Sequence, residues 1–440
     1  MTHADKVERL LAAVRAADAP LGLAKDTSNL FRDRQEGRKA RLDVRDFTAV
    51  LAVDTAAGWV EAEGMVTYEH LVDACLPHGV MPAVVPELKS ITLGGAAAGV
   101  GIEASSFRYG LVHETLAEIE VLLPDGRLVV ATPDNAQADL FFGFPNSYGT
   151  LGYALRLRAR VVPVRPYVRL THHHYTDPAA CFAALERLCA GEADFLDGVV
   201  FGPREFVLTE GHFVGHAPYT SDYGFEHIYY RSLLERDEDY LSVRDFIWRW
   251  DTDWFWCSNN LGLQNPILRR LVGRKRLNSV FYTKLMRLNS RWRLTHRLDR
   301  LMGWHRESVI QDVDIPIAHA AEFLDFLLAE IGILPVWLCP IRPQGRTFTL
   351  YPMRSDTLYV NFGFWDVVRR REAFPPGHHN RLIEAKVMAL GGIKSLYSDS
   401  YYDQTTFWRL YDGAAYRRLK ARYDPHGRAR DLYQKCVLRQ

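Results

Sequence analysis

The sequence predicts an α+β fold in which two successive regions each combine strands with helices. Short runs that alternate apolar and polar residues, such as 47–54 and 59–64, are joined by turn residues and are typical of antiparallel strands. Apolar residues recur at helical spacing in 67–79 and 178–191. With 440 residues, 48% of them hydrophobic and 24% charged, the chain is long enough for two or three domains with a large core.

The first region is expected to span residues 1–165. Its predicted elements are an amphipathic N-terminal helix, the strand pair 47–54 and 59–64, the helix 67–79, and the strands 116–123 and 127–132 around the turn Pro124-Asp125-Gly126. The second region, 166–395, is expected to contain the strands 164–175, 334–341 and 357–364 and the helices 178–191 and 318–332, with a basic aromatic insertion at about 245–306. An aromatic, acidic stretch (395–412) and a helix (413–425) form most of a C-terminal segment, 396–440.

Several common kinds of site are not expected. The six cysteines form no C-x-x-C pair, which favours reduced thiols in the cytoplasm. No run of about 18 apolar residues occurs, so no membrane-spanning helix is predicted. His172, His173 and His174 are consecutive on a predicted strand and therefore point to alternate faces, so we predict no metal site there.

The glycine-rich segment 86–110 is the strongest candidate for a ligand site. It holds five glycines and shows no clear helix or strand period. Glycine allows close approach of the backbone to a ligand, and successive amides in such turns bind anions, so a pyrophosphate is the expected occupant. The alternative is an ordinary glycine-rich turn. Gly99–Ala104 fits G-x-G-x-x-A, but the predicted strands follow it instead of preceding it, which argues against a Rossmann fingerprint.

A basic patch lies in the second region. Between Arg269 and Arg306 the chain has twelve Lys/Arg (269, 270, 274, 275, 276, 284, 287, 291, 293, 297, 300 and 306) and one acid, Asp299. An aromatic cluster precedes it (Phe246, Trp248, Trp250, Trp254, Phe255 and Trp256). Basic segments beside Trp and Phe suit an anionic bilayer, whereas a solvated helical face or a nucleic-acid patch are the alternatives. The candidate headgroup ligands are Arg269, Arg270, Arg274, Lys275 and Arg276.

Four features occur in the order of the flavin-linked oxidoreductases of the vanillyl-alcohol-oxidase type: the early loop 25–32, Thr92–Gly95 closing on Arg108-Tyr109-Gly110, the segment 139–152, and KARYDP at 420–425. Within that superfamily the chain resembles the sterol Δ24-reductase (diminuto/seladin) group and its bacterial relatives. The segments that carry this resemblance are 85–111, 138–168, 265–269, 310–317, 335–343 and 395–412.

The resemblance implies a two-subdomain FAD-binding domain of the PCMH type at 1–165, an α+β substrate (cap) domain at 166–395, and a C-terminal segment that returns to the flavin. FAD is expected to be non-covalent, because the early loop has no histidine. His113 is near the cofactor by motif position, or is a structural histidine. The expected cofactor-binding residues are Lys25, Thr27, Ser28, Asn29, Arg32, Thr92, Leu93, Gly94, Gly95, Gly99, Gly101, Ile102, Glu103, Ser105, Ser106, Tyr109, Gly110, Gly149 and Thr150.

The resemblance also implies reduction of a branched carbon-carbon double bond in a lipid. The bacterial relatives point to a phospholipid-borne 10-methylene-stearoyl chain, reduced to 10-methyl-stearoyl (tuberculostearic acid) with NADPH, beside a SAM-dependent methyltransferase partner. A sterol Δ24-reductase and a non-catalytic partner of the methyltransferase are the alternatives. The chain begins close to its flavin region, so we expect a cytoplasmic protein that binds membranes peripherally; no nucleic-acid partner is expected.

The proton donor is expected among Tyr401, Asp399 and Glu103. Tyr401 and Asp399 belong to a polar aromatic cluster with Tyr397, Tyr402 and Asp403. Glu103 lies in the glycine-rich segment. A tyrosine or an aspartate with a raised pKa can act as a general acid. Alternatively, these groups hydrogen-bond the two regions together.

Overall fold

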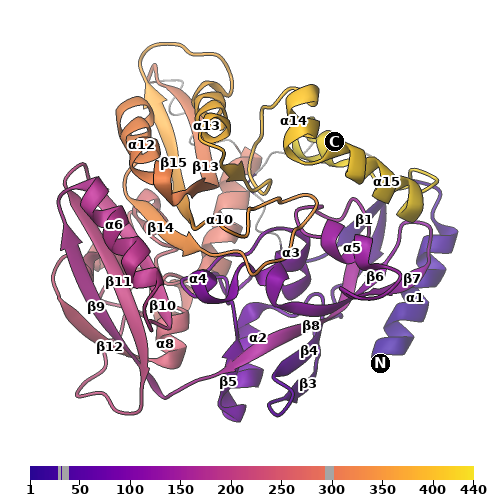
Figure 1. The fold of residues 1–440 in the computed structure, drawn as a ribbon, viewed down its shortest axis with the longest axis horizontal. Coiled ribbons are helices and arrows are strands. Elements are labelled where there is room, and N and C mark those ends of the chain that lie inside the picture. The colour runs from indigo at the N-terminus through magenta and orange to yellow at the C-terminus, as the bar shows by residue number, and fades with distance from the viewer. Residues whose placement is uncertain (28–30, 32–38, 293–301) are drawn as a thin grey trace.

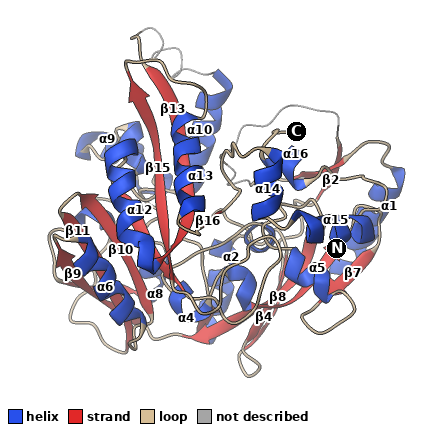
Figure 2. Cartoon of the chain, turned by 45° about the horizontal axis from the view of Figure 1, so that its top comes forward, coloured by secondary structure: helices blue, strands red, loops and turns tan. Residues whose placement is uncertain are grey.

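Two antiparallel sheets form the framework of the protein (Figure 1). The structure is a computed structural model of residues 1–440, and it describes all of them except 28–30, 32–38 and 293–301, with only the backbone described for 286–292. Both sheets are covered by helices on their outer sides (Figure 2). The α+β prediction is therefore confirmed.

The N-terminal sheet has the strand order β3-β4-β8-β6-β7, with β5 paired to β8. The predicted strands appear as β3 (Val50–Asp54), β4 (Trp59–Glu63), β6 (Leu116–Leu122) and β7 (Leu128–Ala131), joined by β5 (Val80–Pro82) and the central β8 (Tyr153–Pro163). The helices of this region are α1 (His3–Ala16), α2 (Tyr68–Cys75), α3 (Leu93–Ala98), α4 (Ser106–Tyr109) and α5 (Ala138–Gly143), and a parallel pair joins β1 (Leu21–Ala24) to β2 (Ala40–Asp43).

The second sheet has eight strands in the order β12-β9-β11-β10-β14-β15-β13-β16. They are β9 (Tyr167–Tyr175), β10 (Phe195–Gly202), β11 (Glu205–Val214), β12 (Glu238–Ser242), β13 (His305–Pro316), β14 (Val336–Ile341), β15 (Tyr359–Arg370) and β16 (Ile393–Lys394). Its helices are α6 (Pro178–Cys189), α7 (Tyr229–Ser232), α8 (Val243–Ile247), α9 (Pro266–Val272), α10 (Ser279–Trp292), α12 (Ala320–Phe326) and α13 (His378–Ala389). The predicted strands and helices of this region are confirmed.

The C-terminal helices are α14 (Gln404–Leu410), α15 (Gly413–Tyr423) and α16 (Leu432–Cys436), and α15 lies beside α5 of the N-terminal region (Figure 1). Asp139 on α5 accepts hydrogen bonds from Arg422 at 2.9 Å and from Tyr423 at 2.6 Å. The Lys420 ammonium donates to the Thr150 carbonyl at 2.8 Å. Residues 420–425 (KARYDP) therefore contact residues 139–152, and both segments are among the four that carry the resemblance to flavin-linked oxidoreductases.

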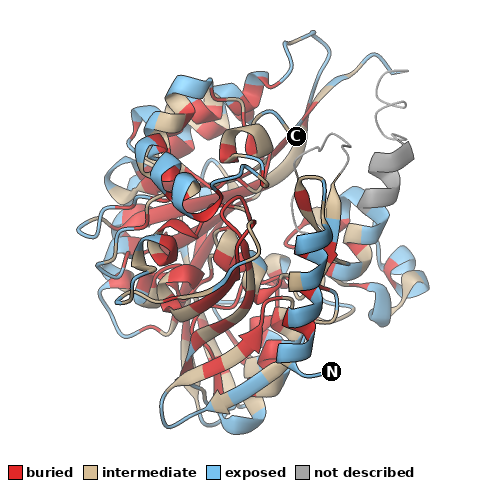
Figure 3. Cartoon of the chain, turned by 90° about the vertical axis from the view of Figure 1, so that its right-hand side faces the viewer, coloured by how far each residue is buried: buried red, intermediate tan, exposed pale blue. Residues whose placement is uncertain are grey.

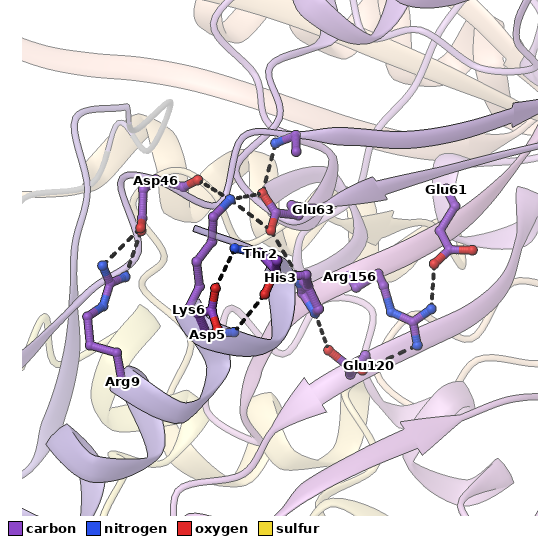
Figure 4. Close-up of polar contacts among 11 residues, drawn as sticks. Thr2, His3, Asp5, Lys6, Arg9, Asp46, Glu61, Glu63, Glu120 and Arg156 are labelled. Atoms are coloured by element: carbon purple, nitrogen blue, oxygen red, sulfur yellow. Dashed lines mark hydrogen bonds and ion pairs between the residues drawn. The ribbon is translucent and has the colours of Figure 1, made fainter.

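Helix α1 is fixed to the N-terminal sheet by a polar network (Figure 4). The buried Glu63 carboxylate on β4 accepts from Lys6 Nζ at 2.7 Å and lies 2.9 Å from His3 Nδ1, while the other His3 nitrogen lies 2.8 Å from Glu120. On the outer side of the helix, Arg9 pairs with Asp46 in solvent. Lys6 and Glu63 therefore form the buried part of this anchor.

The aromatic cluster that was expected to face a membrane is instead part of the core. Trp250 is 1% exposed, and Phe246, Trp248, Trp254, Phe255 and Trp256 are all buried. They pack beneath the second sheet, where buried residues fill the interior between strands and helices (Figure 3). The prediction is wrong because the strands that cover these rings come from distant parts of the chain. Among the described helices, none is both long and apolar enough to cross a bilayer.

Candidate active site at the junction of the two sheets

The glycine-rich segment contains the short helix α3, which the sequence did not predict. Thr92 caps it, its hydroxyl accepting from the Gly95 amide at 3.2 Å. The Leu93 and Gly94 amides donate to the carbonyls of Val66 and Gly64 at 2.9 and 2.8 Å. The amides of Leu93–Gly95 are therefore already paired within the protein, and the expectation that they converge on a diphosphate is wrong for these three groups.

The glycines of this segment are required mainly by packing within the protein. A Cβ at Gly94 would lie 2.7 Å from the Gly64 carbonyl oxygen, and a Cβ at Gly101 would lie 2.6 Å from Val112 Cγ2. Gly110 has a φ of 72°, a conformation that side chains disfavour. The hydroxyls of three further candidates, Ser105, Ser106 and Thr150, also hydrogen-bond to the protein.

Three backbone amides immediately after α3 are free to bind a ligand. Within the described chain, the amides of Val100, Gly101 and Ile102 have no hydrogen-bond acceptor. The turn at 146–149 lies alongside, because the Asn146 amide donates to Gly99 at 3.0 Å and the Tyr148 amide donates to Ala98 at 2.8 Å. The φ angles of Asn146, Tyr148 and Gly149 are 59°, 49° and 77°. Such strained turns often mark ligand sites.

Buried polar atoms of this turn lack partners within the described residues. Asn146 Oδ1 and Ser147 Oγ are fully buried and unpaired, and so is Nδ1 of the neighbouring candidate His113. The His113 ring packs on Phe348 at 4.4 Å, and burial lowers its pKa to about 3, so the ring is neutral. Unpaired buried donors and acceptors imply a ligand or water. The residues at 98–102 and 146–149 therefore fit a polar, hydrogen-bonding cofactor such as FAD.

The early loop is described in part, at residues 25–27 and 31. Of its predicted cofactor residues, Lys25 and Thr27 follow β1, whereas Ser28, Asn29 and Arg32 lie outside the described residues. Phe31 is described, and its amide donates to the Tyr397 carbonyl at 3.1 Å while its ring packs on Trp254 at 5.7 Å. The loop thus reaches the C-terminal segment near the residues described next.

A buried pair of acids lies on β13, at this junction. Asp312 and Asp314 are two residues apart and share a face of the strand. Asp314 accepts from the Tyr351 hydroxyl at 2.6 Å and from the Asn361 amide at 2.8 Å. Asp312 lies opposite Gly363 of β15 and close to the Tyr397 side chain, and its buried Oδ1 has no hydrogen-bond partner among the described residues.

Burial sets the protonation of these acids. It raises the pKa of Asp312 to about 7 and that of Asp314 to about 6, because desolvation disfavours the charged carboxylate. The Tyr397 hydroxyl, which lies near Asp312, accepts a hydrogen bond from Trp365 Nε1 at 2.9 Å. A carboxyl group with a pKa near neutrality can donate a proton at physiological pH. The sequence reasoning missed Asp312, although two acids inside the apolar strand 310–317 were a visible signal.

Aromatic rings surround the Asp312–Tyr397 pair. Trp365 packs on Phe255 at 4.4 Å and on Trp256 at 5.5 Å, and Trp337 lies 6.4 Å away. Asp312 Oδ1 lies above Gly363, where a Cβ would be 2.9 Å from it. The same Cβ would lie 2.7 Å from Trp365 Cη2, so the Trp365 ring fills the space beside Gly363. Oδ1 is therefore shielded from solvent, while the Asp312 residue as a whole is half-buried.

The three residues predicted as proton donors do not form one site. The Tyr401 hydroxyl accepts from Arg439 at 3.1 Å, and Asp399 lies 3.3 Å from the same guanidinium. Tyr401 and Arg439 line a surface groove of about 410 Å³. Glu103 lies elsewhere, in a separate ion cluster.

The ion cluster around Arg249 joins the glycine-rich segment to the second sheet. The Arg249 guanidinium lies 2.8 Å from Asp197, 3.3 Å from Glu103 and 3.3 Å from Glu87, and all four side chains are buried. Burial raises the pKa of both glutamates. Glu103 therefore holds the two regions together, which is the structural alternative considered for it.

The basic candidates divide into two groups. Arg269 is 2% exposed and forms two hydrogen bonds with Asp253, at 2.6 and 2.9 Å, so its prediction as a headgroup ligand is wrong. Arg270, Arg274, Lys275 and Arg276 are exposed. The first two pair with Glu226 and Asp222.

Comparison with known proteins agrees with a flavin site. Residues 1–132 match the model of a family described as "FAD binding domain". Together with the relatives below, this match identifies the protein as an FAD-dependent oxidoreductase.

Over most of its length the chain is similar to sterol reductases. The chain is 28% identical over 408 residues to the Delta(24)-sterol reductase of Homo sapiens, covering 88% of this chain and 75% of that protein. It is 26% identical over 444 residues to the Delta(24)-sterol reductase of Arabidopsis thaliana, covering 92% of this chain and 77% of the relative. The similarity thus extends far beyond residues 1–132, which match the FAD binding domain.

Proposed function

We propose that this protein reduces a branched carbon-carbon double bond in a lipid. The proposed reaction converts a phospholipid-borne 10-methylene-stearoyl chain to the 10-methyl chain, with NADPH as the source of electrons. The single observation that carries the proposal is Asp312 at the junction of the two sheets, an acid beside Tyr397 whose Oδ1 is buried without a hydrogen-bond partner among the described residues and whose pKa is raised to about 7. The relatives that are named Delta(24)-sterol reductases support the class of reaction.

The chemistry requires an acid because an isolated alkene is a poor hydride acceptor. When a proton adds to the terminal CH₂ carbon, the π electron pair forms the new C–H bond and positive charge develops on the tertiary carbon. Reduced FAD supplies the hydride that completes the reduction. The net change is the addition of two hydrogens, one from the acid and one from the reductant.

Asp312 is proposed as the proton donor. With its pKa near 7, an appreciable fraction of the carboxyl group is protonated at neutral pH. Tyr397, whose hydroxyl accepts a hydrogen bond from Trp365 at 2.9 Å, lies beside it. The surrounding rings exclude water, which protects developing positive charge on the substrate from capture by hydroxide or water. Solvent must return the proton to Asp312 between turnovers.

The substrate is tested by direct competition. The purified holoprotein, reduced under anaerobic conditions, is incubated with 10-methylene-stearoyl phospholipid and with a sterol that has a Δ24 double bond, and products are identified by mass spectrometry. We expect a gain of two hydrogens on the acyl chain. Reduction of the sterol alone would make the protein a sterol reductase, as the names of the relatives favour. Reduction of neither lipid would overturn the proposed function.

The methylene group must itself come from a methylation. We propose that a SAM-dependent methyltransferase, acting on an unsaturated acyl chain, supplies the substrate. If the protein served only as a non-catalytic partner of that enzyme, Asp312→Asn would leave the lipids of the cell unchanged, whereas the proposed role predicts that 10-methylene chains accumulate.

A further inference from the structure

Helix α9 presents an apolar face to solvent. Ile267 is 71% exposed, Leu268 is 44% exposed and Leu271 is 75% exposed. The positions i, i+1 and i+4 place these side chains on one side of the helix. Figure 2 shows α9 at the periphery of the molecule. Three large aliphatic side chains on one short helix are unlike the single exposed apolar residues elsewhere, such as Leu51 and Leu128.

The opposite side of α9 is held rigidly. The buried Arg269 side chain pairs with Asp253 and donates a hydrogen bond to the Phe225 carbonyl. Asn265 caps the helix, accepting from the amides of Ile267 and Leu268, and Pro266 begins it. The exposed face is therefore a fixed feature of the fold, because the side chains beneath it cannot rotate outward without breaking a buried ion pair.

Positive charge lies next to this face. Residues 266–285 contain six Lys/Arg (269, 270, 274, 275, 276 and 284) and no Asp or Glu. Arg270 and Arg274 pair with exposed acids, but Lys275, Arg276 and Lys284 have no ion-pair partner in the described part of the chain. All three are exposed. The face thus combines exposed aliphatic groups with uncompensated cations.

We propose that α9 and the adjoining residues 274–276 dock the protein on an anionic bilayer, with Ile267, Leu268 and Leu271 inserted among the acyl chains. Charge complementarity selects this occupant: residues 266–285 contain no acid, the nearby Glu226 and Asp222 are already paired with Arg270 and Arg274, and anionic headgroups neutralise Lys275 and Arg276. Aliphatic insertion with basic residues at headgroup level is the usual arrangement of an interfacial helix. This docking does not depend on the proposed reaction, so vesicles that contain no substrate can test it.

The charge contribution is tested with the holoprotein and vesicles of phosphatidylglycerol and phosphatidylcholine. We expect Lys275→Glu/Arg276→Glu to weaken sedimentation with these vesicles about 30-fold at low salt, given roughly 1 kcal/mol for each basic residue near the surface. Arg204→Glu/Arg430→Glu, at two exposed positions outside the patch, is the matched control and should bind normally. Binding of the wild-type protein should weaken as salt is raised. Equal binding to pure phosphatidylcholine vesicles would overturn the proposal.

The apolar contribution is tested separately. Ile267→Ser/Leu271→Ser should weaken vesicle binding at least tenfold, since each inserted side chain removes apolar area from water. The control Leu51→Ser/Leu128→Ser changes two exposed residues on β3 and β7 and should bind as the wild type does. Flavin content, read from absorbance, should be normal in every variant. Wild-type binding by the α9 variant would overturn the proposal, as would a wild-type dimer that this variant converts to monomer, because a second copy would then cover the face.

Discussion

Asp312 and Asp314 show how partners give different roles to two similar residues. Asp314 is fully buried and Asp312 is half-buried, and burial raises the pKa of both. Asp314 uses both carboxylate oxygens to bind Tyr351 and Asn361, so it fixes β13 to β15 and to the 351 loop. Asp312 has a buried oxygen, Oδ1, without a hydrogen-bond partner among the described residues. Of the two acids, Asp312 is therefore the one with an oxygen left to hydrogen-bond a further group.

Asp312→Asn tests the assignment of the proton donor. The variant keeps the size of the side chain but cannot release a carboxyl proton, so we expect turnover to fall about 10²–10⁴-fold with normal FAD content. Tyr397→Phe should cause a smaller loss, because it removes a polar hydroxyl beside the acid but leaves the carboxyl group in place. Turnover is measured by mass spectrometry of the lipid product.

Tyr401→Phe is the control for that experiment. Its hydroxyl binds Arg439 at a surface groove, so we expect turnover close to that of the wild type. If Tyr401→Phe lost activity while Asp312→Asn kept it, the donor would lie in the Tyr401 cluster and the present assignment would be rejected.

The pH dependence of stability provides a second test of Asp312. An unfolded aspartate has a pKa near 3.8, whereas the folded Asp312 has a pKa of about 7. Between these values the folded state binds a proton that the unfolded state has lost, so the free energy of unfolding must fall as pH rises. Asp314 contributes only up to about pH 6. Between pH 6 and 7 we expect a slope of up to about 1.4 kcal/mol per pH unit from Asp312.

Urea denaturation at pH 6.0, 6.5 and 7.0 measures this slope. Asp312→Asn should reduce it, because the asparagine does not titrate in this range. An unchanged slope in the variant would mean that Asp312 is not protonated in the folded protein.

At the scale of elements, local pattern predicted much of the fold. The turn Pro124-Asp125-Gly126 and the alternating residues around it were sufficient to predict β6 and β7. Helix α3 was missed because two of its six residues are glycines, and its stability comes from the Thr92 cap and from contacts with Gly64 and Val66. The burial of Trp250 was missed for a related reason, since the elements that cover it are far away in the sequence.

The site was predictable only in part, because some of its side chains come from distant parts of the sequence. Residues 92–110 and 139–152 could be recognised as a ligand-binding pattern from local sequence. The role of Asp312 depends on Tyr397 and Trp365, which are 85 and 53 residues further along the chain. No local pattern reveals that these three side chains meet.

The anchor of α1 gives a prediction about elements. Lys6→Met should lower the free energy of unfolding by about 3–5 kcal/mol, because it leaves the buried Glu63 carboxylate without its cation. The control Arg9→Met, on the same helix, removes an exposed pair with Asp46 and should change it by no more than about 1 kcal/mol. Denaturant unfolding compares the two variants. If Lys6→Met and Arg9→Met lowered the free energy of unfolding equally, the Glu63 carboxylate would be stabilised without Lys6.

At the scale of the whole molecule, distant segments meet where the two sheets join. The early loop reaches Tyr397, the glycine-rich segment binds Arg249 through Glu103, and α15 binds the 139–152 segment through Lys420. The C-terminal segment therefore completes the junction. This arrangement explains why the similarity to the sterol reductases includes nearly the whole chain and not the FAD-binding region alone.

The cofactor gives the first prediction at this scale. The protein should be yellow, and denaturation should release its FAD into solution, because the early loop contains no histidine for a covalent bond. Absorbance of the filtrate after denaturation and filtration measures the release. Flavin that stays with the precipitated chain would contradict the non-covalent assignment.

The most direct test of the central claim is the position of deuterium in the product. The reaction is carried out in deuterated water with a protiated reductant and a 10-methylene-stearoyl lipid, and the product is analysed by NMR and mass spectrometry. If an enzymic acid in exchange with solvent protonates the CH₂ carbon, the new methyl group carries one deuterium and the methine carries none. Deuterium at the methine, with none in the methyl group, would contradict the proposed polarity and the role of Asp312.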